Sequence, residues 1–322
     1  MIPYQLDLTW VIAFQAMGDW LIAPMRFFSF LGTEEFYILI LPILYWCIDA
    51  GLGIRVGVIM LFSSGLNLIF KIFFTGPRPY WISTEIKPLW GEIYFGIPSG
   101  HAQTSVAVWG SMAAYLRRRW AWIVAIFLML MIGLSRTFLG AHFFVDMFAG
   151  WLIGGLLLWL FLRYWDPVAA WASRQSLGRQ ILYAFLVSLG MISLGLLAVY
   201  VTRNFEIPEI WIINAARAGD EELAPFTMNG IITSAATLFG LLVGVAWMAT
   251  RGGWQASGPI WKRAARYVVG VIGVLVIWYG LGLVFPRGET LVPFTLRYIR
   301  YALLGAWVSA GGPLIFTKLK FS

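Results

Sequence analysis

The chain contains two histidines, and both stand next to residues that suit them for chemistry. His142 precedes Asp146 by four positions, a spacing that on a helix brings the carboxylate beside the imidazole. Arg136 lies six residues earlier, at the end of a strongly apolar run. Charged groups at such a depth are costly to desolvate, so their presence indicates a function. The alternative is a structural polar pair that ties two helices together.

Further polar residues accompany the two histidines, His101 and His142. Lys71, Arg78 and Arg136 supply three cations for phosphate oxygens, and an arginine can bind such oxygens in bidentate fashion. Ser99 and Gly100 stand where an apolar run begins, as a helix N-cap and a residue without a side chain. The free N–H groups of that first turn favour an anion. Individually, Lys71 and Arg78 are also typical of cations that anchor the end of a span.

This set of residues predicts phosphoryl transfer. His142, oriented by Asp146 through its other nitrogen, is a suitable nucleophile toward phosphorus. His101 is then the general acid for the leaving oxygen and afterwards the base for water. The cations already offset the charge on the phosphate oxygens, so we expect neither a metal nor another cofactor.

Composition indicates where these residues lie. Of 322 residues, 60% are hydrophobic and 12% charged, and the mean hydropathy is +0.79. These values are typical of a helical membrane protein with several spans. The net charge of +8 comes from basic residues dispersed between apolar runs, which argues against a nucleic-acid partner. Cys47 is the single cysteine, which excludes an intrachain disulfide.

Apolar runs predict the helices. Residues 4–31 are amphipathic and predict one interfacial or weakly hydrophobic first helix, for which a membrane span stays open. Nine stronger runs follow, each long enough for a bilayer with some tilt. They cover residues 35–51, 54–74, 98–116, 120–139, 143–165, 180–201, 226–249, 266–285 and 296–317.

Charge asymmetry between the runs predicts the topology. Thirteen cations gather at one set of ends, against only Asp49 and Asp166. Most acids gather at the other set, so we expect the cation-rich side to be cytoplasmic and the histidines to face outside. The thirteen are Arg55, Arg117, Arg118, Arg119, Arg163, Arg174, Arg179, Arg251, Lys262, Arg263, Arg266, Lys318 and Lys320.

Three connections between the runs are long. Residues 75–97 and 202–225 are expected outside, and 166–179 is expected to be a cytoplasmic hinge. The first connection is rich in proline and aromatic residues, which slightly favours a membrane-surface anchor over the lip of a substrate entrance.

In order along the chain, these pieces resemble the signature of the type 2 phosphatidic acid phosphatase superfamily, over about residues 1–165. The matching motifs are Lys71-x6-Arg78-Pro79, Pro98-Ser99-Gly100-His101 and Ser135-Arg136-x5-His142-x3-Asp146. The resemblance implies a six-helix core whose first helix lies in 4–31, a phosphohistidine at His142 and the acid role of His101. The predicted fold is therefore all-α and polytopic, with about four further C-terminal transmembrane helices.

These observations predict a phosphatase core at 1–165, the hinge at 166–179 and a C-terminal bundle of unknown role at 180–322. We expect hydrolysis of a lipid phosphate monoester or polyprenyl diphosphate, with the bilayer and this lipid as partners. The expected location is a bacterial-type inner membrane, with the site on its extracytoplasmic side. A phosphotransferase with the same phosphohistidine stays open. A transporter is disfavoured, because no inverted repeat is discernible and the charges cluster at one face.

Overall fold

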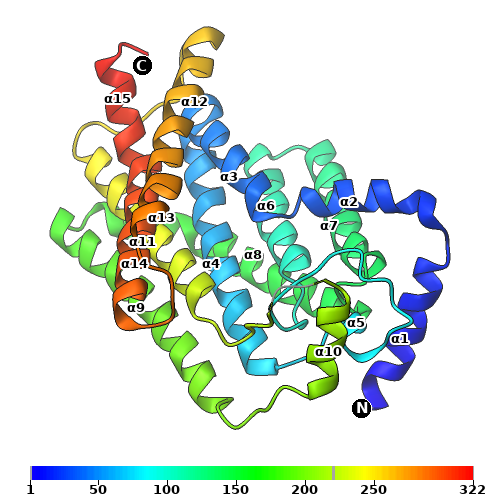
Figure 1. Ribbon diagram of the computed structural model, residues 1–322. Coiled ribbons are helices and arrows are strands. Elements are labelled where there is room, and N and C mark those ends of the chain that lie inside the picture. The colour runs from blue at the N-terminus through cyan, green and yellow to red at the C-terminus, as the bar shows by residue number, and fades with distance from the viewer. Residues whose placement is uncertain (1, 220–221, 322) are drawn as a thin grey trace. The chain divides into compact units, whose positions relative to one another are not determined.

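The structure is a computed structural model that describes residues 2–219 and 222–321, and every regular element in those ranges is helical (Figure 1). This confirms the predicted all-α class. The helices are α1 (Ile2–Gln15), α2 (Ile22–Phe30), α3 (Glu34–Ile43), α4 (Ala50–Phe74), α5 (Pro79–Ile82), α6 (Gly100–Leu116), α7 (Arg119–Phe138), α8 (Phe144–Ser173), α9 (Leu177–Val201), α10 (Glu209–Arg217), α11 (Asn229–Ala249), α12 (Ile260–Leu275), α13 (Leu281–Val284), α14 (Leu291–Ala306) and α15 (Gly312–Lys318).

Short helical turns of other types extend several of these helices. A 3-10 turn precedes α2, and π-helical turns follow α3, join α12 to α13, and join α14 to α15. They are η1 (Asp19–Leu21), η2 (Leu44–Ile48), η3 (Val276–Gly280) and η4 (Trp307–Gly311).

Seven helical segments in the described residues are long and apolar enough to cross a bilayer, which makes the chain a multi-pass membrane protein. Four of the seven follow α8, as the predicted C-terminal extension requires. The pair Asp19–Phe30 and Glu34–Ile48, bent by 49°, adds an eighth if it is one span. The expected run at 98–116 forms α6, which at 17 residues is not among them. The seven are Ala50–Ile82, Arg119–Phe138, Phe144–Ser173, Leu177–Val201, Asn229–Ala249, Ile260–Val284 and Leu291–Lys318.

The expectation of one first helix over 4–31 is wrong. The segment forms α1 and α2, and the break falls at Gly18, whose φ of 121° is rarely adopted by residues with a side chain. The end of α1 is tied down by Gln15, which accepts a hydrogen bond from the Lys87 amide and donates to the carbonyls of Lys87 and Phe138. Long-range bonds of this kind outweigh the local apolar periodicity.

The 75–97 connection is not the membrane-surface anchor that its composition favours. Tyr80, Trp81 and Phe95 are buried in a core cluster together with Val11 and Phe143. The other outer connection folds onto the same cluster. Its helix α10 packs against α5, and the side chain of Asn214 donates to the carbonyl of Trp81 at 3.0 Å. Both connections therefore contribute residues to this core cluster.

The predicted hinge at 166–179 is largely helical in the structure. Helix α8 continues through Asp166 and Pro167 to Ser173, and α9 begins at Leu177. A proline removes one helical hydrogen bond, a loss that neighbouring groups or water can make good. The proline signal therefore does not end this helix, and only residues 174–176 connect the two helices.

The chain forms two compact units that are interleaved along the sequence. The first comprises Met1–Tyr37, Leu66–Trp159 and Gly195–Thr227, and the second comprises Ile38–Gly65, Leu160–Leu194 and Met228–Ser322. The core of the first unit contains the cluster around Trp81. The predicted division at 166–179 stays a prediction.

The core of the second unit contains an apolar cluster around Trp46 and a close contact between two helices. Trp46, Cys47 and Phe316 belong to one apolar cluster, beside which the buried Arg266 donates to main-chain carbonyls of Trp46 and Phe321. Elsewhere α11 and α14 lie so close that a Cβ at Gly240 would collide with the carbonyl of Ala302. Small residues allow such close backbone approach between membrane helices.

Candidate active site

All eight predicted site residues lie in the first unit, at the ends of helices and in the connections between them. They are Lys71 near the end of α4, Arg78 in the connection that follows, Ser99, Gly100 and His101 at the start of α6, Arg136 near the end of α7, His142 just before α8, and Asp146 in the first turn of α8.

His142 is buried between a carboxylate and a guanidinium. Its Nδ1 lies 3.3 Å from Oδ2 of Asp146, and its Nε2 lies 3.4 Å from Nη1 of Arg78. Because a guanidinium only donates, Nε2 is the accepting nitrogen and Nδ1 carries the proton toward Asp146. The same Oδ2 accepts the main-chain N–H of Phe143 at 3.0 Å. The arrangement leaves the lone pair of Nε2 facing the cations.

Lys71 and Arg78 are not anchors at the membrane surface, because both are buried and bound to main-chain carbonyls. Arg78 donates to the carbonyls of Tyr94, Phe95 and Ala141 over 2.7–3.1 Å. Lys71 donates from Nζ to the carbonyl of Phe95 at 2.6 Å and to that of Gly96 at 3.1 Å. Carbonyls satisfy the N–H groups without cancelling the charge, so the positive potential stays available for an anion.

Arg136 is fully buried and bridged by a carboxylate to Arg78. Its Nη2 lies 2.5 Å from Oε1 of Glu92, and the other oxygen of Glu92 lies 3.7 Å from Nη2 of Arg78. Nη1 of Arg136 donates to the hydroxyl of Ser29 at 2.7 Å, and the guanidinium lies over the ring of Trp90. Glu92 thus offers its two oxygens to two cations, as a phosphate group would.

Electrostatics keep Glu92 ionised and His142 neutral. Burial opposes the ionisation of Glu92, but Arg78 and then Arg136 outweigh it and lower its pKa to about 2. Burial also lowers the pKa of His142, and the positive charges of Arg78 and Lys71 lower it further. A neutral imidazole is the form that can attack an electrophile.

Glu92 is a charged residue of this site that the sequence did not reveal. It stands in the 75–97 connection, where its charge counted only toward the topology. The sequence placed several cations at the same ends of the spans. Because buried cations are rarely left without a counter-charge, an acid was to be expected near them. Spacing alone does not say which of several acids fulfils that role.

The start of α6 lies against the same site. Ser99 is the N-cap, as predicted: its Oγ accepts the N–H of Ala102 at 3.4 Å. The N–H of Ser99 donates to the carbonyl of Asp146 at 2.9 Å, which links this turn to α8. His101 interacts electrostatically with Glu92, and its Nε2 is buried without a hydrogen-bond partner among the described residues. A buried, unpartnered nitrogen is available to a ligand.

A buried amide pair, also missed from sequence, supports this turn. Nδ2 of Asn67, on α4, donates to the carbonyl of Pro98 at 3.2 Å and to Oε1 of Gln103 at 2.9 Å. A Cβ at Gly100 would lie 2.9 Å from Oδ1 of Asn67, so the turn and α4 are in close contact. The amides position the turn and take no part in the charge pattern.

Within the part of the chain that the structure describes, no group of three or more His, Cys, Asp or Glu side chains is arranged to hold a metal ion. Activity without a metal stays a prediction.

Two family models match the chain. The model described as PAP2 superfamily matches residues 52–170, a range that contains every predicted site residue and also Glu92. A second, described as PAP2 superfamily phosphatase, transmembrane extension, matches residues 232–322. The chain belongs to the PAP2 superfamily. Four spans follow α8, beyond the predicted core, and the second match overlaps the last three of them.

Curated members of the PAP2 superfamily are similar over part of the chain. Glucose-6-phosphatase 3 of Bos taurus is 32% identical over 173 residues, 46% of this chain and 50% of its own length. Sphingosine-1-phosphate phosphatase 2 of Mus musculus is 29% identical over 44% of this chain and 42% of its own. Phosphatidylglycerophosphatase B of Bacillus subtilis (strain 168) is 29% identical over 44% of this chain and 73% of its own length.

The chain thus spans about half the length of the first of these PAP2 relatives. No solved structure matches it.

Proposed function

We propose that this protein is an integral membrane phosphatase that hydrolyses a lipid phosphate monoester or a polyprenyl diphosphate through a phosphohistidine at His142. The observation that carries the proposal is the placement of His142, with Asp146 at Nδ1 and Arg78 at Nε2. The names of the PAP2 relatives, which include a sphingosine-1-phosphate phosphatase and a phosphatidylglycerophosphatase, support a phosphorylated membrane lipid as substrate.

The first step transfers the phosphoryl group to the enzyme. Arg78 exchanges its contact with His142 for a phosphate oxygen, which frees the lone pair of Nε2. That lone pair forms the N–P bond while the P–O bond to the lipid breaks. The departing oxygen takes a proton from His101, and the carboxylate of Asp146 stabilises the positive charge that develops on the His142 ring.

The second step returns the enzyme to its starting state. Water gives a proton to His101 while its oxygen bonds to phosphorus, and the N–P bond to His142 breaks. Inorganic phosphate leaves, and both histidines regain their initial protonation. Lys71, Arg78 and Arg136 stabilise the charge on the phosphate oxygens throughout, as fixed donors that need little reorganisation.

Glu92 has to release part of its hold when the substrate binds. Its carboxylate and a phosphate group compete for the same two guanidinium groups, Arg78 and Arg136. We infer that Glu92 keeps the two cations in place while the site is empty. The negative charge of Glu92 offsets the repulsion between Arg78 and Arg136 before the substrate binds.

The substrate class is tested with purified protein in detergent. Phosphate release is followed from phosphatidic acid, phosphatidylglycerol phosphate, a polyprenyl diphosphate and a sphingoid phosphate, with the His142→Ala variant as background. We expect release from at least one of them. Phosphate recovered on an added lipid acceptor, with none released to water, would instead indicate a phosphotransferase. No phosphoryl transfer from any of the four would contradict the proposal.

The extracytoplasmic location of the site is tested by labelling intact cells with an impermeant maleimide. Cysteines replace Glu85, an exposed residue of the 75–97 connection, or Arg118, an exposed residue between α6 and α7, in a Cys47→Ser background. The charge asymmetry predicts labelling at position 85 and protection at position 118. Labelling only at position 118 would place the site in the cytoplasm.

A further inference from the structure

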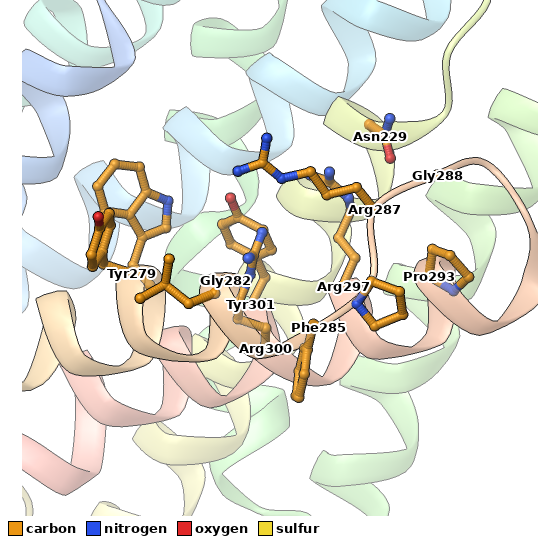
Figure 2. A pocket seen from close by; sticks show the side chains of 13 residues that line it. Asn229, Tyr279, Gly282, Phe285, Arg287, Gly288, Pro293, Arg297, Arg300 and Tyr301 are labelled. Carbon is orange, nitrogen blue, oxygen red and sulfur yellow. The ribbon is translucent and has the colours of Figure 1, made fainter.

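The second unit contains a cavity of about 570 Å³, a volume typical of small-ligand sites. It lies where the Ile260–Val284 span ends and the Leu291–Lys318 span begins. Figure 2 shows its lining, which includes three arginines and several aromatic rings. The residues that matter below are Trp278, Tyr279, Arg287, Arg297, Arg300 and Tyr301.

The arginines come from two elements. Arg287 reaches in from the connection between α13 and α14, while Arg297 and Arg300 lie three residues apart on one face of α14 (Figure 2). None of the residues that line the cavity is acidic. The carboxylate of Glu289, in the same connection, accepts a hydrogen bond from the Asn229 side chain at 3.3 Å. The cavity therefore gathers positive charge.

Two of these cations have no carboxylate partner in the part of the chain that the structure describes. Among the described residues, neither Arg287 nor Arg300 forms an ion pair, and Nε of Arg300 is buried without a hydrogen-bond partner. Arg297 donates from Nη1 to the hydroxyl of Thr233 at 3.3 Å. Clustered like charges repel each other, and a bound anion would offset that repulsion.

The cavity walls hold the guanidinium groups in place. The ring of Tyr301 lies 4.8 Å from the guanidinium of Arg300 and 6.0 Å from that of Arg297. A stacked guanidinium keeps its N–H groups at its edge, where oxygens can reach them. Gly282 makes room for this arrangement, since a Cβ there would lie 2.7 Å from Nη1 of Arg300.

A π-helical turn forms part of the wall. Trp278 and Tyr279 lie in η3, and both are exposed. Turns of this type inside α-helices are frequent at functional sites, because the extra residue redirects side chains. Aromatic rings beside cations at the end of a span are also typical of the depth at which lipid head groups lie.

We propose that this cavity binds the phosphate group of an anionic ligand. The phosphate group can belong to the head of a phospholipid or to free phosphate, and the chemistry of recognition is shared. Arginine is well suited to phosphate, whose oxygens accept bidentate hydrogen bonds from a guanidinium group. The site uses no residue of the proposed active site and does not depend on the proposed function.

Native mass spectrometry of the full-length protein in detergent tests the proposal. The probe is an equimolar mixture of phosphatidylglycerol, an anionic phosphodiester, and zwitterionic phosphatidylcholine. We expect adducts of phosphatidylglycerol to dominate on the unmodified chain. Replacing both Arg297 and Arg300 by Gln should weaken its binding ~10-fold or more, given the typical strength of charge-assisted hydrogen bonds.

Two control variants separate this cavity from other anion sites. Arg251→Gln removes an exposed arginine that stacks on Trp247 and does not line the cavity, and should leave the lipid preference unchanged. Arg136→Gln removes a cation of the proposed active site and should also leave it unchanged. Phosphatidylglycerol displaced by inorganic phosphate would identify a site that accepts free phosphate, whereas undisplaced lipid would identify a head-group site. Either result supports the proposal.

The proposal is overturned if the double variant retains the lipid preference, or if Arg136→Gln abolishes it. Elution in size-exclusion chromatography and the thermal unfolding temperature establish that each variant is folded. If the double variant does not fold, Arg287→Gln and Gly282→Ala replace it. The first removes an exposed cation and the second displaces Arg300, so both should lower the preference. An unchanged preference in both would overturn the proposal.

Discussion

The two arginine clusters of this protein differ in how their charges are held. In the proposed active site, Arg78 and Arg136 are 1% and 0% exposed and bind carbonyls, Ser29 and Glu92, which leaves only Nε of Arg136 without a partner among the described residues. In the second unit, Arg287 is exposed and Arg300 is half-buried, and neither forms an ion pair within the described residues.

The difference indicates two uses of the same side chain. Fixed, buried donors serve a transition state, because they need not reorganise when charge develops. Accessible donors serve reversible binding, because the anion itself completes their coordination. The comparison predicts that changes in the first cluster alter turnover and that changes in the second alter binding alone.

The largest expected effect is the loss of turnover on removing the proposed nucleophile. His142→Ala should lower phosphate release from the lipid substrate by ~10⁴-fold or more, since no other group can form the covalent intermediate. Phosphate release in detergent measures this. Removal of the exposed Arg287 in the second unit is the matched comparison, and should leave turnover intact. Residual turnover of His142→Ala within tenfold of the unmodified protein would contradict the assigned role.

A smaller effect is expected when an arginine becomes lysine. Arg78→Lys keeps the charge but cannot reach the carbonyls of Tyr94, Phe95 and Ala141 together. We expect kcat/KM to fall about 10²–10³-fold, as for the loss of one fixed donor. Arg297→Lys in the second unit should change kcat/KM by no more than about twofold. Equal losses in both variants would remove the distinction between the clusters.

The next effect is on stability. Glu92→Ala leaves Arg136 buried without its carboxylate, which should lower the free energy of unfolding by about 3 kcal/mol. Glu85→Ala removes an exposed carboxylate from the same connection and is the control. Thermal unfolding in detergent measures both. An unfolding temperature of Glu92→Ala equal to that of the control would show that this ion pair contributes nothing to stability.

The stability effect of Glu92 should depend on pH. The two arginines hold its pKa in the folded state at about 2, below the ordinary value of a glutamate. Its contribution is therefore complete above about pH 4.3, the value for the unfolded chain, and is lost as pH falls toward 2. The gap between the unmodified protein and Glu92→Ala should narrow over that interval. A constant gap would contradict the ion pair as its cause.

The smallest expected effect is that of a chelator. EDTA should change phosphatase activity by no more than about twofold. In the proposed mechanism, arginine and lysine side chains offset the negative charge of the phosphate, and no metal is needed. Orthovanadate, which resembles phosphate, should inhibit. Activity lost in EDTA and restored by Mg²⁺ would contradict this account.

The sequence predicted the parts of the site that have fixed spacing. His142 and Asp146 are four positions apart, and Ser99 starts an apolar run, so local geometry was sufficient there. Glu92 has no such relation to Arg136, 44 residues away, and is brought to it only by tertiary structure. The same limit explains Gln15, whose long-range bonds end the first helix where apolar periodicity continues.

The sequence also contained a signal that we did not use. Arg297 and Arg300 stand inside the predicted run 296–317, where a charge indicates a function as much as Arg136 does. They belong to no recognised motif, and their partner Arg287 comes from a separate connection. Only the structure shows that the three line one cavity.

The central claim, that His142 carries the phosphoryl group, is tested most directly by trapping the intermediate. p-Nitrophenolate leaves without needing a proton, so His101→Ala should still form the phosphoenzyme from p-nitrophenyl phosphate but should hydrolyse it slowly. We predict a burst of p-nitrophenol from this variant, with an acid-labile phosphate on the peptide that contains His142. The double variant His101→Ala/His142→Ala should give neither. A burst from His142→Ala, with the phosphate on the peptide that contains His101, would reverse the two roles and contradict the account.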